Sequence, residues 1–272
     1  MTNKWISESE TALKAVTAGM EILSERKLEG LSMSTKGNPR DIVTELDVYI
    51  EEQIKKLLGT SGHKIIGEES VSKTDAAGLE KGTAWLIDPI DGTTNFVSSL
   101  PYYSVSVGLI SDSRFPVGAV AIPSLKEIFF TMGESGSYMN GRTLKAKRAK
   151  LQESLIVASF SAANEDRAQR AKEFDLFGRL NDRSRGCLRL GSASVNICNA
   201  AAGRFNAAYG ISNKLWDVAG ALAVASRAGC RVYTERKAGT FLISYVLGAE
   251  GAADELAELL KKEGLADLER IN

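Results

Sequence analysis

The sequence predicts a mixed α/β fold made of two consecutive parts. Apolar residues recur at helical spacing in the first part of the chain, and from 104 to 132 short segments alternate or run apolar between turn signals, as antiparallel strands do. From about residue 155 onward, expected strands alternate with expected helices. We therefore expect an N-terminal α+β subdomain over residues 1–145 and a C-terminal α/β subdomain over residues 146–272.

Two helices open the N-terminal part. Apolar residues at every third or fourth position predict an amphipathic helix over about 7–28, and a polar loop follows over 32–40. Thr44 and Asp47 have the spacing of a capping box, which predicts that a second helix begins there and ends near Gly59. The strands expected after it are 64–67, the apolar run before Asp88, 104–110, 117–122 and 127–132.

A basic, loop-like stretch over 145–150 leads into the C-terminal part. Its pattern alternates between short apolar runs and longer amphipathic segments, as in a sheet covered by helices. The expected strands are 155–160, 187–190 and 205–208, and the expected helices are 168–180, 192–202, 216–228 and 252–262.

The composition argues against several classes of function. Lys plus Arg and Asp plus Glu both number 34, so the formal net charge is zero, and neither nucleic acid nor a membrane surface is an expected partner. No apolar run approaches the roughly 20 residues that span a bilayer, and the N-terminus lacks a signal-peptide core, so we expect a cytoplasmic protein. The widely spaced Cys187, Cys198 and Cys230 predict reduced thiols. With His63 as the single histidine, any metal is expected to be bound by oxygens.

The segment 84–96 brings two carboxylates, a turn and a helix start to one point. An apolar run precedes Asp88, so Asp88 and Asp91 are expected in the turn after a buried strand. Gly92 permits close backbone approach, and the two threonines that follow it are good N-cap residues, which predicts a helix whose first N–H groups bind an anion. A divalent cation beside that anion would make a phosphoryl-transfer site. The alternative is an ordinary turn whose aspartates accept local amide hydrogen bonds.

Four carboxylates stand at expected element boundaries, namely Glu68, Asp88, Asp91 and Asp217. Mg²⁺ prefers such oxygen ligands, and two or three ions could activate a water and neutralise a phosphate. Simpler alternatives exist for two positions: Asp217 caps an alanine-rich helix, and Asp47 does no more than close its capping box. Spacing along the chain does not show that the four carboxylates meet.

Five segments resemble, in the same order, the signature blocks of the inositol monophosphatase family, whose members are Mg²⁺-dependent, lithium-sensitive phosphatases. The resemblance runs from about residue 41 to 233. The segments are Asp41-Ile-Val-Thr-Glu-Leu-Asp47, Gly67-Glu-Glu-Ser70, Trp85-Leu-Ile-Asp-Pro-Ile-Asp-Gly-Thr-Thr-Asn-Phe96, Gly191-Ser-Ala-Ser194 and Leu215-Trp-Asp-Val-Ala-Gly220.

This resemblance implies a five-layer α/β/α/β/α sandwich of the inositol monophosphatase and fructose-1,6-bisphosphatase type. It implies hydrolysis of a small phosphate monoester by a metal-activated water, inhibition by lithium, and a homodimer. By position, it assigns a first Mg²⁺ to Glu68, Asp88, Asp91 and the carbonyl of Ile90. A second ion falls to Asp88, Asp91 and Asp217, and Glu68 also stands where a third ion would bind.

The resemblance also assigns roles around these ions. Thr93 paired with Asp47 would activate the attacking water, with Glu68 as a further catalytic residue, and the amides of Gly92 and Thr93 would bind the phosphate. The substrate contacts that it implies are Asp91, Ser192 and position 210, which is Gly210 in this chain.

Departures from the family pattern leave the substrate open. The family usually carries glutamate at the position of Gly210 and aspartate at that of Asn206, so a hydroxyl-binding carboxylate is missing and selectivity for inositol is not implied. The stretch 94–96 favours the inositol-phosphatase branch over 3′(2′),5′-bisphosphate nucleotidases, which usually have Lys-Glu-Phe there. A bisphosphate nucleotidase or a histidinol-phosphate phosphatase stays an alternative. From another class, so does a non-catalytic regulatory protein that binds metal and phosphate.

Overall fold

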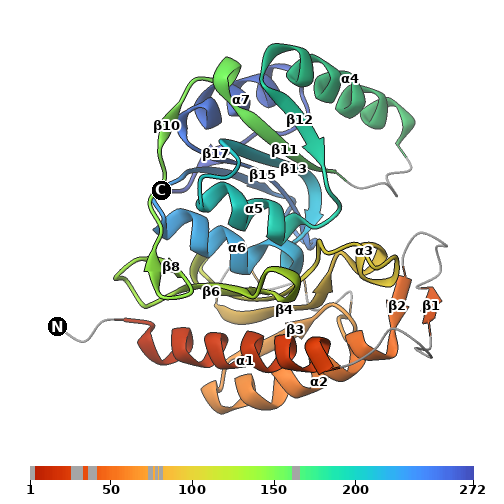
Figure 1. Cartoon of the computed structure of the whole chain (residues 1–272), viewed down its shortest axis with the longest axis vertical. Helices are drawn as coiled ribbons and strands as arrows, with labels where there is room; N and C mark the ends of the chain where they lie inside the picture. Colours follow the sequence, from red (N-terminus) through yellow and green to blue (C-terminus); the bar gives the residue numbers. More distant parts are fainter. Residues whose placement is uncertain are drawn as a thin grey trace.

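Five layers make up the computed structural model, which describes residues 4–25, 33–35, 42–72, 76, 79, 82–160 and 166–272. From the bottom of Figure 1 upward, a pair of helices is followed by a seven-stranded sheet, a second pair of helices, a six-stranded sheet and a third pair of helices. The expected α/β/α/β/α sandwich is therefore confirmed. Of the expected elements, residues 26–28 of the first helix, most of the 32–40 loop and Asp41 lie outside the described residues.

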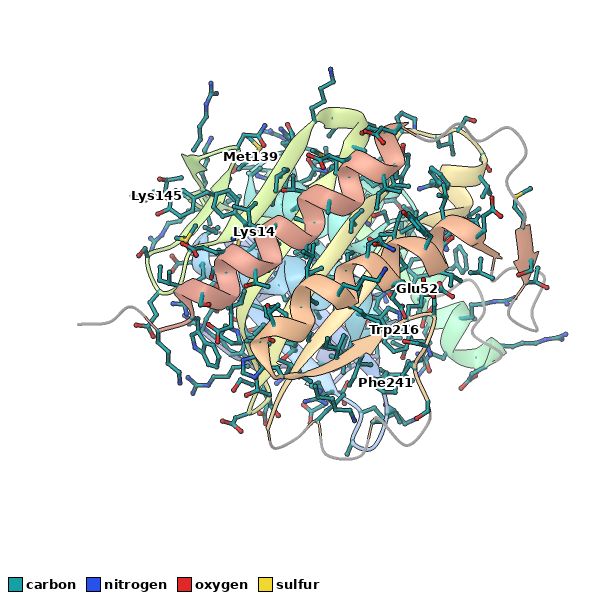
Figure 2. The ribbon with its side chains drawn as sticks, turned by 90° about the horizontal axis from the view of Figure 1, so that it is seen from below. Lys14, Glu52, Met139, Lys145, Trp216 and Phe241 are labelled. Atoms are coloured by element: carbon teal, nitrogen blue, oxygen red, sulfur yellow. The ribbon has the colours of Figure 1, made fainter. Side chains whose placement is uncertain are left out.

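Helices α1 (Ile6–Glu25) and α2 (Glu45–Leu58) form the outer layer and lie side by side across the first sheet (Figure 2). The capping box that was predicted for α2 is present, because the backbone N–H of Thr44 donates to Asp47 Oδ2 at 2.7 Å. Just before it, β1 (Met33–Thr35) pairs antiparallel with β2 (Ile42–Thr44), so residues 33–35 of the expected loop form a strand.

The seven-stranded sheet has the order β3-β4-β5-β6-β7-β8-β9. Its first pair is parallel and the rest are antiparallel. The antiparallel pairing of the strands between 104 and 132 was predicted from their turn signals. The strands are β3 (Lys64–Gly67), β4 (Thr83–Asp91), β5 (Ser104–Ser111), β6 (Arg114–Ile122), β7 (Glu127–Thr131), β8 (Ser137–Met139) and β9 (Arg142–Thr143).

The six-stranded sheet has the order β12-β11-β13-β15-β14-β17. Three of its strands, β14, β15 and β17, were not predicted, because they lie after Cys230, where the resemblance is weak; the signal for β15 was a mainly apolar run, which is buried here. The strands are β11 (Leu155–Phe160), β12 (Gly186–Arg189), β13 (Ala207–Lys214), β14 (Arg231–Arg236), β15 (Leu242–Gly248) and β17 (Glu269–Arg270).

Helices α5 (Ala193–Ala201) and α6 (Leu215–Arg227) fill the layer between the two sheets, and α4 (Arg167–Arg183) and α7 (Ala252–Lys262) cover the far face of the second sheet (Figure 1). Three glycines let α6 approach the first sheet closely. A Cβ on Gly108 would lie 2.4 Å from the amide nitrogen of Gly220, and one on Gly118 would lie 2.0 Å from the Gly220 carbonyl oxygen.

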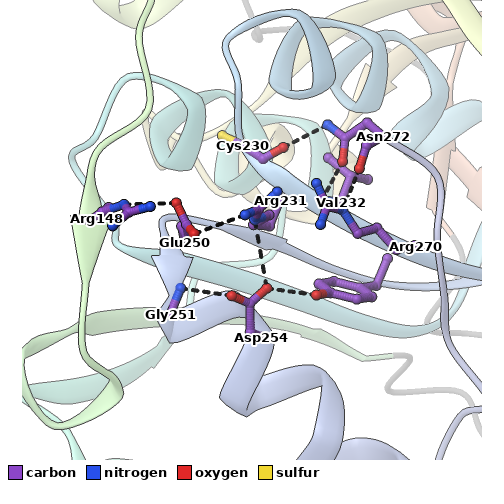
Figure 3. Close-up of polar contacts among 10 residues, drawn as sticks. Arg148, Cys230, Arg231, Val232, Glu250, Gly251, Asp254, Arg270 and Asn272 are labelled. Atoms are coloured by element: carbon purple, nitrogen blue, oxygen red, sulfur yellow. Dashed lines mark hydrogen bonds and ion pairs between the residues drawn. The ribbon is translucent and has the colours of Figure 1, made fainter.

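A network of polar contacts joins residues 145–150, which lead from the first sheet to the second, to strands of the second sheet (Figure 3). Within the stretch expected as a basic loop, β10 (Arg148–Ala149) pairs in parallel with β16 (Glu250–Gly251). Arg148 and Arg231 both donate to the carboxylate of Glu250, at 2.8 and 2.9 Å. The loop expectation is therefore wrong at these two residues, because the partner that makes them a strand is about 100 positions away.

The largest apolar cluster of buried residues runs from Ile66 to Leu247 and so draws on both parts of the chain. Cys187, Cys198 and Cys230 are buried and free, as predicted. Among the described residues, no helix is both long and apolar enough to cross a membrane.

Candidate active site

The carboxyl end of β4 carries the first two aspartates of the site. The pairing of β4 with β5 shifts register between Asp88 and Asp91 and then resumes, with Asp91 opposite Ser104. Asp88 Oδ1 accepts a hydrogen bond from the backbone N–H of Ile90 at 3.0 Å. We expected both aspartates in a turn after the strand; instead they flank an irregularity inside it, because the neighbouring strand continues past Pro89.

The helix start after β4 is confirmed, but its cap differs from the prediction. Helix α3 (Thr93–Val97) has Gly92 as its N-cap, in the left-handed conformation with φ +94°, and no side chain caps it. A Cβ on Gly92 would lie 3.1 Å from the carbonyl oxygen of Tyr102, so both the conformation and the tight packing require glycine. The expectation that the threonines cap this helix is therefore wrong; they occupy its first turn.

Three carboxylates meet at this point from three separate elements. One oxygen each from Glu68, Asp88 and Asp217 lies within 4.8 Å of the others, close enough to share a cation. Asp217 is in the first turn of α6, whose N-cap is Lys214, so it is not the capping residue of that helix. The simpler reading of Asp217 as an N-cap is therefore wrong.

The charges in this cluster oppose one another. Burial, and then the negative charges of Glu68, Asp91 and Asp217, raise the pKa of Asp88 well above its usual range. Burial, and then the charges of Glu68 and Asp91, likewise raise the pKa of Asp217. A divalent cation among these oxygens would relieve both effects, so the donor set fits a hard metal ion.

Glu68 owes its place to the end of β3 and to α2. The buried Glu51 side chain of α2 accepts a hydrogen bond from the backbone N–H of Glu69 at 2.8 Å and pairs with Lys55 at 2.7 Å. It packs so closely on Gly67 that a Cβ there would lie 2.2 Å from the Glu51 carboxyl carbon. Through Glu51, helix α2 therefore fixes the turn that contains Glu68.

Asp91 is held by the second half of the chain rather than within the three-carboxylate cluster. Its Oδ2 accepts hydrogen bonds from Ser192 Oγ at 2.6 Å, from the backbone N–H of Ser194 at 2.7 Å and from Ser194 Oγ. Its Oδ1 accepts one longer bond from the Ala193 amide at 3.3 Å. Burial raises the pKa of Asp91, and these hydrogen bonds oppose that shift. Sequence reasoning placed Ser192 at the substrate and assigned no role to Ser194.

Asp47 and Thr93 are brought together, but each has a nearer partner. Thr93 Oγ1 lies 3.4 Å from Asp47 Oδ1 and 2.9 Å from the carbonyl oxygen of Ile90. Asp47 Oδ2 accepts from both the amide and the hydroxyl of Thr44, at 2.7 and 2.6 Å. The capping box and the contact with Thr93 therefore use different oxygens of one buried carboxylate.

Gly210 lies inside β13, next to a register shift that ends at Asn213. A Cβ on Gly210 would lie 2.1 Å from Asn213 Oδ1 and 2.3 Å from the Tyr245 ring, so these two side chains fill the space that a larger residue would need. Ser212, within the shift, has a φ of +52°, which is uncommon for a residue other than glycine. The sequence showed that the family's glutamate is missing at position 210, but it did not show that Asn213 and Tyr245 fill that space.

Comparisons with known proteins show what this chain is similar to. The sequence profile of the inositol monophosphatase family matches residues 5–266. The inositol-1-monophosphatase of Bacillus subtilis is 31% identical over 239 residues, which cover 86% of this chain and 84% of that protein. Inositol monophosphatase 1 of Bos taurus is 29% identical over 236 residues, 84% of each chain. The structure of SuhB from Mycobacterium tuberculosis superposes with a TM-score of 0.77 at 26% identity, covering 95% of this chain and 97% of that one.

Proposed function

This chain belongs to the inositol monophosphatase family and is a phosphoric monoester hydrolase, and we propose that it hydrolyses a small phosphate monoester with the help of Mg²⁺. The observation that carries the proposal is the meeting of Glu68, Asp88 and Asp217, three carboxylates from three elements, beside Asp91. Without a bound cation, burying these mutually repelling carboxylates together would cost folding free energy.

In this proposal a first cation is bound by Glu68, Asp88, Asp91 and the carbonyl of Ile90, and a second by Asp88, Asp91 and Asp217. Mg²⁺ suits such oxygen ligands, and when bound it would lower the pKa of a water and neutralise charge on the phosphate. Two or three ions per site follow from the family roles of these residues. Lithium would inhibit by competing at one of these positions.

The residues around the cations have roles of their own. The first N–H groups of a helix have no partner within it, so the amides of Gly92 and Thr93 would bind phosphate oxygens at the start of α3. Thr93 Oγ1 contacts both Asp47 and the Ile90 carbonyl, and in this proposal it would accept a proton from the attacking water while donating its own to Asp47. This requires the hydroxyl to turn from Ile90 toward Asp47.

The substrate we propose first is an inositol monophosphate or a similar polyol phosphate, as the names of the relatives in Bacillus subtilis and Bos taurus suggest. The atoms nearest to a Cβ at position 210 belong to the amide of Asn213 and the ring of Tyr245, which are neutral, where the family usually carries a glutamate. A leaving group with hydroxyls therefore fits better than a cationic one, which weighs against histidinol phosphate. We also propose a cytoplasmic homodimer, as in the family.

The test is release of inorganic phosphate from inositol 1-phosphate, histidinol phosphate, 3′-phosphoadenosine 5′-phosphate and fructose 1,6-bisphosphate, with and without Mg²⁺ and with added Li⁺. We expect Mg²⁺-dependent, Li⁺-inhibited release that is fastest with inositol 1-phosphate. Faster release from another ester would replace the substrate assignment, and release that EDTA does not reduce would overturn the metal dependence. Silence on every ester, with intact Mn²⁺ binding, would favour the non-catalytic alternative.

A further inference from the structure

The two oxygens of Asp91 are used unequally. Three donors converge on Oδ2, namely Ser192 Oγ, Ser194 Oγ and the Ser194 amide, whereas Oδ1 has one long contact with the Ala193 amide. A carboxylate oxygen has two lone pairs, so Oδ2 has no capacity left for a cation. Oδ1 is the oxygen that can serve as a metal ligand.

The hydroxyl of Ser194 also contacts the hydroxyl of Ser104, which lies behind it. Its single proton goes to Asp91, because an ionised carboxylate only accepts. Ser104 Oγ lies 2.5 Å from Ser194 Oγ, so Ser104 must be the donor in that pair. The result is a directed chain from Ser104 to Ser194 to Asp91, and all three side chains are buried. Ser104 is also the residue opposite Asp91 across β4 and β5.

We infer that Ser194, backed by Ser104, is a positioning residue that fixes the Asp91 carboxylate so that Oδ1 alone binds the cation. Partners that orient a metal ligand commonly affect metal affinity as strongly as tenfold to a hundredfold. This inference rests on the proposed function, since it needs a cation at the cluster. It adds a residue to which neither the sequence nor the family resemblance gave a role, and it makes Asp91 a ligand through a single oxygen.

Ser194→Ala is the variant of choice. Ser192 is a poorer target, because its hydroxyl also accepts from the Val195 amide at 3.3 Å as the N-cap of α5. The matched control is Ser137→Ala: Ser137 is equally buried, lies on β8 of the first sheet, and its hydroxyl has no hydrogen-bond partner among the described residues. A serine buried without a partner tests whether loss of a buried hydroxyl is enough by itself.

The readout is direct Mn²⁺ binding to the full-length protein, followed by electron paramagnetic resonance of the free ion. We expect Ser194→Ala to raise the Mn²⁺ dissociation constant about tenfold, and Ser137→Ala to leave it unchanged. In turnover of the best ester, excess Mg²⁺ should restore kcat of Ser194→Ala at an unchanged KM for the ester. Restoration by metal would trace the loss to metal occupancy, and the Ser137→Ala control separates it from a general effect of losing a buried hydroxyl.

The outcomes distinguish failure of the proposed function from failure of the positioning role. If the wild type binds no Mn²⁺, the proposed function falls. If the wild type binds and Ser194→Ala binds equally well, or if Ser137→Ala loses as much affinity, the positioning role is wrong. Should Ser194→Ala fail to fold, Ser104→Ala is the second variant, because it leaves every direct contact of Asp91 in place. It should raise the Mn²⁺ dissociation constant by a smaller factor. An unchanged dissociation constant in Ser104→Ala would overturn the proposed series of hydrogen bonds from Ser104 through Ser194 to Asp91.

Discussion

Asp217 is the residue through which the repulsion inside the cluster can be measured. Burial and the charge of Glu68 raise its pKa in the folded protein, so binding of a proton favours folding. That contribution is fully present below the ordinary aspartate pKa of about 3.9 and is lost as pH rises through the raised value. We expect metal-free Asp217→Asn to be more stable than the wild type, by a margin that grows with pH.

Melting temperatures measured in EDTA between about pH 4.5 and 8 test this expectation, since that window lies above the ordinary aspartate pKa. The control is Asp182→Asn, at an exposed aspartate of α4, whose curve should run parallel to that of the wild type. Saturating Mg²⁺ should reverse the order, because only the wild type keeps every ligand. Equal slopes for Asp217→Asn and the wild type in EDTA would show that the carboxylates do not repel as inferred.

Thr93 separates catalysis from metal binding. Its hydroxyl contacts Asp47 and the Ile90 carbonyl and is not one of the proposed metal ligands. We expect Thr93→Ala to lower kcat about a hundredfold, the lower range for loss of general acid–base catalysis, without changing the Mn²⁺ dissociation constant. Thr94→Ala, at the exposed next residue of α3, is the control and should keep normal turnover. A Thr93→Ala enzyme with normal kcat would remove Thr93 from the mechanism.

At the level of elements, the distance from α6 to the first sheet decides where Asp217 lies. A Cβ on Gly220 would be 2.7 Å from the Val107 carbonyl oxygen, which belongs to a strand that cannot move alone. We expect Gly220→Ala to destabilise the protein by about 1–3 kcal/mol, the usual cost of overpacking, and to weaken Mn²⁺ binding because α6 carries Asp217 outward. Urea unfolding and Mn²⁺ titration measure the two effects.

Gly178 gives the opposite result with the same substitution. It lies inside α4, and no atom of the residues that the structure describes is within 4 Å of the position of its Cβ. Gly178→Ala should therefore stabilise the protein by about 0.5–1 kcal/mol and leave Mn²⁺ binding unchanged. Destabilisation of both variants to the same degree would mean that the close contact at Gly220 is not the cause.

Elements that depend on nearby residues were predictable, and those that depend on distant partners were not. The cap of α2 needs only Thr44 and Asp47, three positions apart. The irregularity between Asp88 and Asp91 depends on pairing with β5, and the short strand at Arg148 depends on Glu250. Most candidate site residues came from motifs and resemblance, but the contact of Asp91 with α5 spans 101 positions and no local pattern indicates it.

At the level of the whole molecule, one apolar cluster contains residues of both expected subdomains. The division at residues 145 and 146 stays a prediction, but a shared core of this kind should make the halves unfold together. We expect a single calorimetric transition in EDTA and a single one at higher temperature with Mg²⁺. Two resolved transitions in EDTA would show that the halves are independently stable.

The contact between Asp91 and α5 also has a consequence for the time at which the protein matures. Ribosomes add about 5–20 residues per second, so Ser192 is synthesised roughly 5–20 s after Asp91, which precedes it by 101 positions. During that interval the emerging chain contains Glu68, Asp88 and Asp91 without the helix that anchors Asp91 or the Asp217 that completes the cluster. The full set of proposed ligands therefore exists only after Asp217 has been synthesised, so a nascent chain lacks a complete cation site until late in its production.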